Sequence, residues 1–184
     1  MFAGPDSFGM RTMALEHQSP DYPENTRWQM GGVVFVGVHV VGSNNNRDDV
    51  TEFAARDAAD RAWLHDSFDL ATRTRAIGLM VIMQADPSFE VVSPTDRAAR
   101  GVDGLDPFVG ALRDETIGFA RPVALVHGDG HRYRLDHPLL DRAGVPIPNL
   151  VRVETFGTPD LSWVLATVDA RDPQVFRFDI RRVG

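Results

Sequence analysis

Three short apolar runs, separated by two longer amphipathic segments, constrain the fold of this chain more than any other feature. The runs are rich in β-branched residues and apolar on both faces, and they lie at residues 32–41 (GVVFVGVHVV), 79–83 (LMVIM) and 122–127 (PVALVH). Such runs are typical of central strands in a parallel sheet, which is buried on both faces. Right-handed βαβ crossovers set such strands side by side, with their carboxyl ends at one edge. The sequence therefore predicts an α/β fold that contains a βαβαβ unit.

The two segments between these runs have the spacing of helices. Asp49 and Glu52 have the spacing of a capping box at the start of the first segment, and apolar residues recur after them at helical intervals. Asp106 is expected to cap the second helix, with Pro107 in its first turn, where a missing N–H costs nothing. The polar stretch at residues 86–104, which precedes the second helix, is predicted to be a loop.

The rest of the chain divides into an irregular start and a strand-rich end. Residues 1–31 show neither strand nor helix periodicity and contain scattered prolines, so they are expected to be an irregular N-terminal segment. Residues 32–184 are expected to form a single α/β domain. Its last part is predicted to consist of antiparallel strands, at residues 151–157, 161–169 and 175–180, separated by turn signals.

Composition excludes several classes of protein. The 26 acidic and 19 basic residues give a formal net charge of −7, so neither nucleic acid nor an anionic membrane is expected as a partner. Lysine and cysteine are both absent, which excludes a Schiff-base or phosphate-loop lysine, thiol nucleophiles, disulfides and Cys-ligated metals. The sequence shows no signal peptide and no run of about 20 apolar residues. A soluble, cytoplasmic protein is therefore the default expectation.

Polar side chains follow all three predicted strands, where their carboxyl ends meet. They are Ser43, Asn44, Asn45 and Asn46 after the first strand, Gln84 and Asp86 after the second, and His127, Asp129 and His131 after the third. Open α/β sheets bind ligands at this edge, and side chains of these types bind metals or phosphate. The alternative is that these are ordinary polar loops, because Asn-rich and Gly-Asp-Gly segments also form turns. The segment His-Gly-Asp-Gly-His is the most specific of the three, because it places two imidazoles and a carboxylate within five residues.

This last segment resembles a motif of a known family. Residues 122–138 (PVALVHGDGHRYRLDHP) resemble the last motif of the calcineurin-like metallophosphoesterases, Gly-His-x-His, which is often followed by x-Tyr. Gly128, His131 and Tyr133 fit the spacing of that motif. Asp129 stands where the family has its first histidine.

The similarity extends over residues 28–178. Residues 33–46 are similar to the strand after the family's Gly-Asn-His motif, residues 79–89 resemble the strand that ends in its His-x-Pro motif, and residues 161–179 are similar to its closing hairpin. Gln84 occupies the position of a ligand histidine. The pattern is closer to a divergent bacterial branch with Gln-Ala-Asp and His-Gly-Asp than to the standard enzymes.

The family's amino-terminal motifs have no counterpart here. An Asp-x-His strand end, the Gly-Asp-x-x-Asp motif with its bridging aspartate, and the Gly-Asn-His-Asp/Glu motif do not occur before Gly32. The chain thus resembles the C-terminal half of the family's domain, a partial metallophosphoesterase-type α/β sandwich in which antiparallel strands follow the βαβαβ unit. Its first residues are then expected to connect to the other half. A half-domain leaves sheet surface uncovered, which favours self-association.

The resemblance implies metal-dependent hydrolysis of a small-molecule phosphoester, by phosphatase or phosphodiesterase chemistry. In complete family members two divalent metal ions, such as Mn, Fe, Zn or Mg, bind the phosphate and lower the pKa of a bridging water. Gln84, Asp129 and His131 would be the metal ligands from this chain, with His127 as a catalytic residue or alternative ligand. Amide and carboxylate oxygens in place of imidazoles favour harder ions. Without the bridging aspartate, the domain is expected to be incomplete and weakly active or inactive by itself.

Two other interpretations stay open. In the first, the chain is a degenerate, non-enzymatic binding or scaffolding module of the same fold, and its polar strand ends are ordinary turns. The second, an unrelated α/β hydrolase, lacks support because no Gly-x-Ser-x-Gly elbow follows any strand. Among the remaining candidates, His39 is expected inside the first strand and His137 in a loop near the site. Arg132 and Arg134 are expected either at a substrate phosphate or on a solvated strand face.

Overall fold

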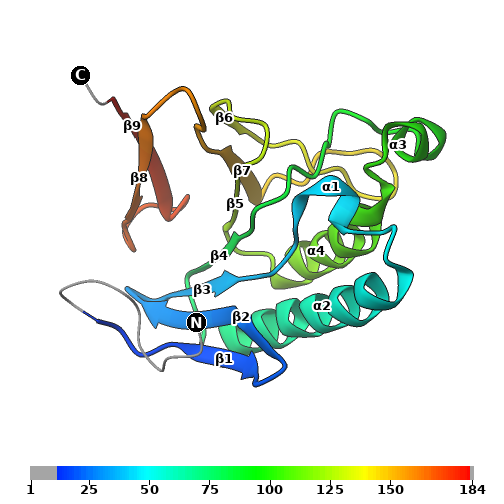
Figure 1. Ribbon diagram of the computed structural model, residues 1–184. Coiled ribbons are helices and arrows are strands. Elements are labelled where there is room, and N and C mark those ends of the chain that lie inside the picture. Colours follow the sequence, from blue (N-terminus) through cyan, green and yellow to red (C-terminus); the bar gives the residue numbers. More distant parts are fainter. Residues whose placement is uncertain (1–11, 183–184) are drawn as a thin grey trace.

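A computed structural model describes residues 12–182 of the chain. Its centre is a seven-stranded mixed sheet with the order β1-β2-β3-β4-β5-β7-β6, and the strands β8 and β9 form a separate hairpin (Figure 1). The strands of the large sheet are β1 (Glu16–Ser19), β2 (Tyr22–Met30), β3 (Val33–Gly37), β4 (Gly78–Ile82), β5 (Val123–His127), β6 (Arg134–Asp136) and β7 (Leu150–Glu154). The remaining elements are α1 (Gly42–Asn45), α2 (Val50–Arg73), α3 (Pro94–Arg100), the 3-10 turn η1 (Asp103–Leu105), α4 (Asp106–Phe119), β8 (Trp163–Val168) and β9 (Phe176–Arg181).

The centre of the sheet is parallel, as the three apolar runs predict. β3 pairs with β4 and β4 pairs with β5, both in parallel, and Val36, Val81 and Leu125 lie in register across the three strands. All three side chains are fully buried. Apolar side chains on both faces of these strands need cover on both sides of the sheet. The structure thus confirms the mixed α/β class and the predicted βαβαβ unit.

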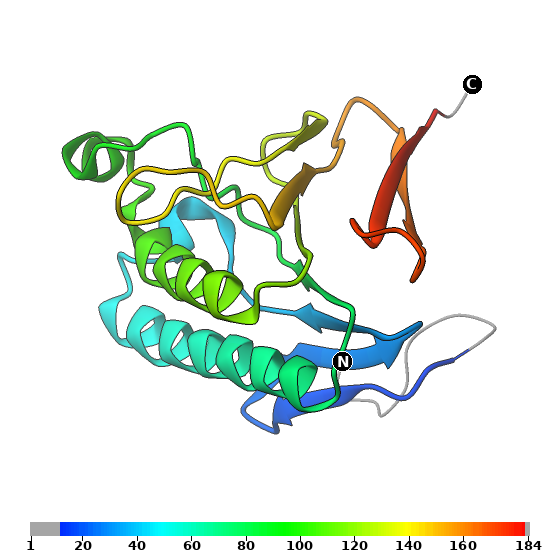
Figure 2. The same ribbon diagram turned by 180° about the vertical axis from the view of Figure 1, so that it is seen from behind.

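Helices α2 and α4 lie side by side on one face of the sheet (Figures 1 and 2). The predicted cap of α2 is confirmed, because the Asp49 side chain accepts a hydrogen bond from the N–H of Glu52. Phe68 of α2 and Phe119 of α4 are buried and meet edge to face, with 5.6 Å between ring centroids. Both βα connections therefore leave the sheet on the same side. In the described part of the chain, no helix has the length and apolar character needed to cross a membrane.

The hairpin of β8 and β9 covers the opposite face of the sheet (Figure 2). Val175 and Phe176 pack there against Phe35 and Met80 in a second hydrophobic cluster. Gly78 permits this contact, because a Cβ at that position would lie 3.0 Å from Cζ of Phe176. The antiparallel pairing of β8 with β9 confirms the predicted hairpin.

The prediction that residues 1–31 are irregular is wrong where β1 and β2 form. These strands pair antiparallel with each other, and β2 continues the sheet beside β3. The inward side chains of β2 are the buried Asn25 and Arg27, and Asn25 donates a hydrogen bond of 2.8 Å to Asp60 of α2. A strand whose buried positions are polar lacks the alternation that marks a strand in a sequence. Residues 1–11 of the predicted segment lie outside the described residues.

The stretch at residues 86–104 is also more regular than predicted, because it contains α3. Ser93 caps this helix by accepting a hydrogen bond from the N–H of Asp96. Only Arg97 of α3 is buried, so the sequence has no apolar stripe that would predict this helix. Asp106 begins α4 without capping it, because its carboxylate pairs with Arg97 instead.

The strand predicted at residues 151–157 is β7, and it runs parallel to β5 rather than antiparallel. The connection at residues 128–149 is long enough for the crossover that a parallel pair needs. The antiparallel pairing at this side of the sheet is that of β6 with β7, at the edge.

Candidate functional site

Three strand ends meet at the carboxyl edge of the sheet. The Gln84 side chain, after β4, donates from Nε2 to Oδ1 of Asp129, after β5, at 2.8 Å. The backbone N–H of Gly42, after β3, donates to Oε1 of the same Gln84. A Cβ at Gly42 would lie 3.0 Å from Oδ2 of Asp129. Two of the three predicted metal ligands are therefore in direct contact, although they are 45 positions apart in the sequence.

The loop after β3 forms a turn of left-handed helix. Ser43, Asn44, Asn45 and Asn46 have φ values of 53°, 56°, 57° and 54°. Asparagine tolerates this region better than most side chains, which explains the Asn run. Arg56 of α2 holds the turn by donating to Oδ1 and to the carbonyl of Asn45, at 2.6 and 2.8 Å.

A second contact ties this turn to the start of α4. The N–H of Gly104 donates to Oδ1 of Asn44 at 2.7 Å, and the Gly104 carbonyl accepts from Nδ2 of Asn45. A Cβ at Gly104 would lie 2.1 Å from the carbonyl oxygen of Asn44, so only glycine fits there. The turn is therefore held from two sides.

Beside the meeting point of the strand ends lies a cavity of about 530 Å³, which we call the strand-end cavity. Its lining residues are His39, Val41, Gly42, Ser43, Asn46, Glu52, Arg56, Gln84 and Asp129. His39 lies beyond the end of β3 and not inside the strand as expected, and it is half-buried. The sequence does not mark Glu52 and Arg56 as site residues, because an acidic and a basic residue four positions apart are typical of an ordinary pair on a helix.

The two candidate imidazoles have other partners. His131 is exposed, and its Nδ1 lies 3.0 Å from the carbonyl oxygen of Thr158. The His127 side chain is buried, with its Nδ1 3.0 Å from the carbonyl oxygen of Gly128, and burial lowers the pKa of this imidazole. Over residues 12–182, no group of three or more His, Asp or Glu side chains is arranged to hold a metal ion. Gln84 and Asp129 alone thus give two oxygen donors, which is part of a ligand shell for a hard cation.

An ionic cluster with a buried centre lies next to this edge, formed by residues from the loop after β4 and from β6 and β7. Arg134 donates to Asp86 at 3.0 Å and also pairs with Glu90 and Glu154. Arg152 pairs with Glu90 at 2.8 Å and with Asp136 at 2.6 Å. The cluster consists of Asp86, Glu90, Arg134, Asp136, Arg152 and Glu154.

The cluster contains fully buried charges. Glu154 and Arg152 have exposed fractions of 0 and 1%, and the hydrogen bond from Arg152 holds the pKa of Asp136 below its usual range. Gly130 leaves room for this carboxylate, because a Cβ at that position would lie 2.0 Å from Oε1 of Glu154. Asp86 and Arg134, both candidates for ligand contact, are therefore used within the protein.

The remaining candidates also have local structural partners. Arg132 is exposed and approaches Glu154 only to 3.7 Å. His137 places Nδ1 2.7 Å from the carbonyl oxygen of Leu150 and so braces β7. Tyr133 stacks on Phe156, with 5.4 Å between ring centroids.

Comparisons of the chain with protein-family models, curated proteins and solved structures found no match.

Proposed function

We propose that this chain is a metallophosphoesterase-type domain, a partial α/β sandwich, that binds a divalent cation and a small phosphoester at the strand-end cavity. The observation that carries the proposal is the 2.8 Å contact between Gln84 and Asp129 in the wall of that cavity. Both positions match ligand positions of the family that the sequence resembles. With two oxygen donors, the chain by itself turns over a phosphoester slowly or not at all.

The two side chains fit a hard divalent cation in part. Asp129 has no arginine or histidine partner among the described residues, so a bound cation would give its carboxylate the ionic partner that it lacks. Gln84 offers a neutral amide oxygen, which is a weaker donor than imidazole for Mn or Zn. When bound, such an ion polarises the phosphoester and lowers the pKa of a coordinated water.

The rest of the cavity wall carries one positive and one negative side chain, together with an imidazole. Arg56 places a positive charge there while its own donors stay on Asn45, Glu52 and the carbonyl of His39. The His39 imidazole lines the same wall and can donate to a phosphate oxygen. The charge of Arg56 partly offsets that of Glu52, which would otherwise repel a phosphate.

Manganese titration of the full chain tests the ligand assignment. Asp129→Asn should weaken Mn²⁺ binding, measured by calorimetry, by about tenfold or more, because a carboxylate is replaced by an amide. Asp21→Asn, at an exposed turn position between β1 and β2, is the matched control and should leave the affinity unchanged. Equal affinities of wild type and Asp129→Asn would contradict the assignment.

A gain-of-function variant sharpens this test. Gln84→His restores the imidazole of the family's pattern and should tighten Mn²⁺ binding about tenfold, with a rise in hydrolysis of bis-p-nitrophenyl phosphate. Gln174→His makes the same change at an exposed position before β9 and should do neither. An equal response in both variants would show non-specific binding by the added imidazole.

The second candidate function is a non-enzymatic binding or scaffolding module. It is favoured by the use of both ends of the Gln84 amide within the protein, where Oε1 accepts from Gly42 and Nε2 donates to Asp129. These bonds join three strand ends, which is a structural role. If the folded wild-type chain binds no Mn²⁺ and Gln84→Ala lowers only its thermal stability, this second function holds.

A further inference from the structure

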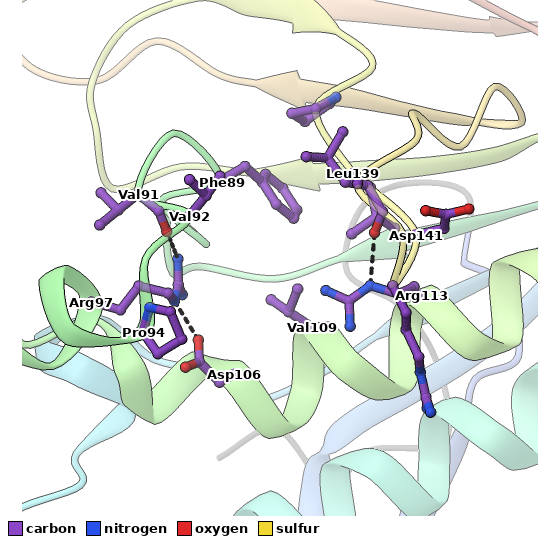
Figure 3. A pocket seen from close by; sticks show the side chains of 14 residues that line it. Phe89, Val91, Val92, Pro94, Arg97, Asp106, Val109, Arg113, Leu139 and Asp141 are labelled. Carbon is purple, nitrogen blue, oxygen red and sulfur yellow. Dashed lines mark hydrogen bonds and ion pairs between the residues drawn. The ribbon is translucent and has the colours of Figure 1, made fainter.

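A second cavity lies between α3, α4 and the loop before β7, with a volume of about 430 Å³. We call it the α3–α4 pocket, and Figure 3 shows it from close by. It shares no lining residue with the strand-end cavity. Phe89, Val91, Val109 and Leu139 give it apolar walls. A cavity of this size with mostly apolar walls is typical of a site for a small organic ligand.

Two of its charged residues neutralise each other. Arg97 donates to the carbonyls of Ser88 and Val91, at 2.9 and 3.0 Å, and its Nε pairs with Asp106 (Figure 3). Two more carbonyls, those of Pro87 and Val102, accept from its Nη2. Arg97 therefore has no donor left for a ligand, and it fixes the wall of the pocket.

Two other charged residues are also engaged. Asp141 accepts the N–H groups of Ala143 and Val145, both at 2.8 Å, and so shapes its own loop. Arg142 is exposed and pairs with Asp114 at 2.6 Å. These contacts hold both side chains in place.

Arg113 is different, because only part of its guanidinium is used. Its Nε donates to the carbonyl of Leu140 at 2.8 Å, which orients the planar group beside Val109 (Figure 3). Its two terminal nitrogens have no partner among residues 12–182. Two adjacent N–H donors on a fixed guanidinium match the two oxygens of a carboxylate.

We infer that the α3–α4 pocket binds a small monocarboxylate with an apolar body. The carboxylate lies on the terminal nitrogens of Arg113, and the apolar body packs between Phe89, Val91, Val109 and Leu139. The other lining charges form one internal ion pair and one external ion pair, and one carboxylate is held by backbone N–H groups. Arg113 is thus the one lining arginine that has no ionic partner among residues 12–182. This site is independent of the proposed phosphoester site.

A matched pair of probes tests the inference on the full chain. Octanoate and octanamide have the same apolar body, and only octanoate carries a charge. Calorimetric titration should give sub-millimolar binding of octanoate and about tenfold weaker binding of octanamide, because a charge-assisted hydrogen bond is the stronger contact.

Variants locate the binding. Arg113→Gln should weaken the binding of octanoate about tenfold, to the affinity of octanamide, and should leave the affinity for octanamide unchanged. Arg171→Gln, which removes an exposed, ion-paired arginine outside the pocket, is the matched control and should leave the binding of both probes unchanged. Val92→Glu, at a lining position that is 71% exposed, should weaken the binding of octanoate by charge repulsion and leave the binding of octanamide unchanged.

Three results would overturn the inference. They are no binding of octanoate to the folded chain, equal binding of octanoate and octanamide, and octanoate binding that Arg113→Gln leaves unchanged.

Discussion

The strand-end cavity and the ionic cluster both take a residue from the loop after β4, and they use polar side chains in opposite ways. Gln84 and Asp129 are exposed and share one side-chain hydrogen bond, whereas Asp86, in the same loop as Gln84, and Arg134, at the start of β6, are bound into a network. Glu154, in that network, is fully buried. A carboxylate that already has its cation is not available to a ligand, while one without a cation is.

This difference is one of charge pairing and not of residue type. In the cluster, two arginines face four carboxylates, with Arg134 and Arg152 each in contact with more than one. In the strand-end cavity, Asp129 has an amide as its partner. The position of a polar residue at a strand end therefore indicates a candidate site, and its ion pairs decide whether the site is open.

The largest expected effect is in the cluster. Arg134→Ala leaves Glu154 buried without its main cation and should lower the free energy of unfolding by about 3–5 kcal/mol. Arg132→Ala, which removes an exposed side chain 3.7 Å from Glu154, is the control and should cost less than about 1 kcal/mol. Urea denaturation measures both. A loss for Arg134→Ala no greater than the control's would show that the cluster is not a network of buried charges.

Asp60 is a third case for this comparison, because it is a buried carboxylate whose cation does not hydrogen-bond to it. Arg56 lies 3.6 Å away, and burial raises the pKa of Asp60 from 3.8 to about 6. Because the folded state holds the proton more tightly, the stability that Asp60 contributes is fully present below pH 3.8 and is lost as the pH rises through about 6. The loss should be on the order of 2–3 kcal/mol.

Denaturation across this pH range measures the loss. Asp60→Asn should abolish this part of the pH dependence, while Asp21→Asn, at an exposed turn, should leave it intact. A wild-type chain whose stability does not fall relative to Asp60→Asn between pH 4 and 7 would contradict the raised pKa.

A smaller effect is expected where the cavity wall is supported. Gly104→Ala forces a Cβ against the carbonyl of Asn44 and should destabilise the fold by about 1–3 kcal/mol. It should also weaken the binding of any ligand in the strand-end cavity. Gly110→Ala, inside α4 with no atom within 4 Å of the new Cβ, should stabilise the fold by about 0.5–1 kcal/mol. If thermal denaturation shows that both variants change the stability in the same direction, the close contact between Gly104 and Asn44 does not constrain the fold.

The smallest expected effect on stability is that of Asp129→Asn. The amide keeps an acceptor for Gln84 and tolerates the φ of 72° at this position, so the free energy of unfolding should change by less than about 0.5 kcal/mol. The same variant should weaken Mn²⁺ binding. A large loss of stability would place Asp129 with the cluster and not with an open site.

The predictable part of the fold is the part whose buried side chains are apolar. The βαβαβ unit follows from apolar runs that need cover on both faces, and the meeting of Gln84 with Asp129 follows from the parallel order of their strands. β2 and α3 escape prediction because Arg27 and Arg97, both buried, take the places that apolar residues usually hold.

The sequence predicts which strand ends meet at the candidate site, but not the partners of most side chains there. His131 belongs to the predicted metal motif, yet its φ of 57° and the carbonyl of Thr158 give its side chain another place. The cluster was not predictable either, because Arg134 and Glu90 are 44 positions apart and no local pattern indicates that they pair. Side-chain partners of this kind depend on the tertiary fold.

The short segment at residues 103–106 contacts and supports the walls of both cavities. On one side, Asp103 pairs with Arg47 and Gly104 holds the left-handed turn of Asn44. On the other side, Asp106 holds Arg97 in the wall of the α3–α4 pocket. The cavities share no lining residue, yet a displacement of this segment would reshape both at once. One substitution there could alter both cavities, although the cavities do not touch.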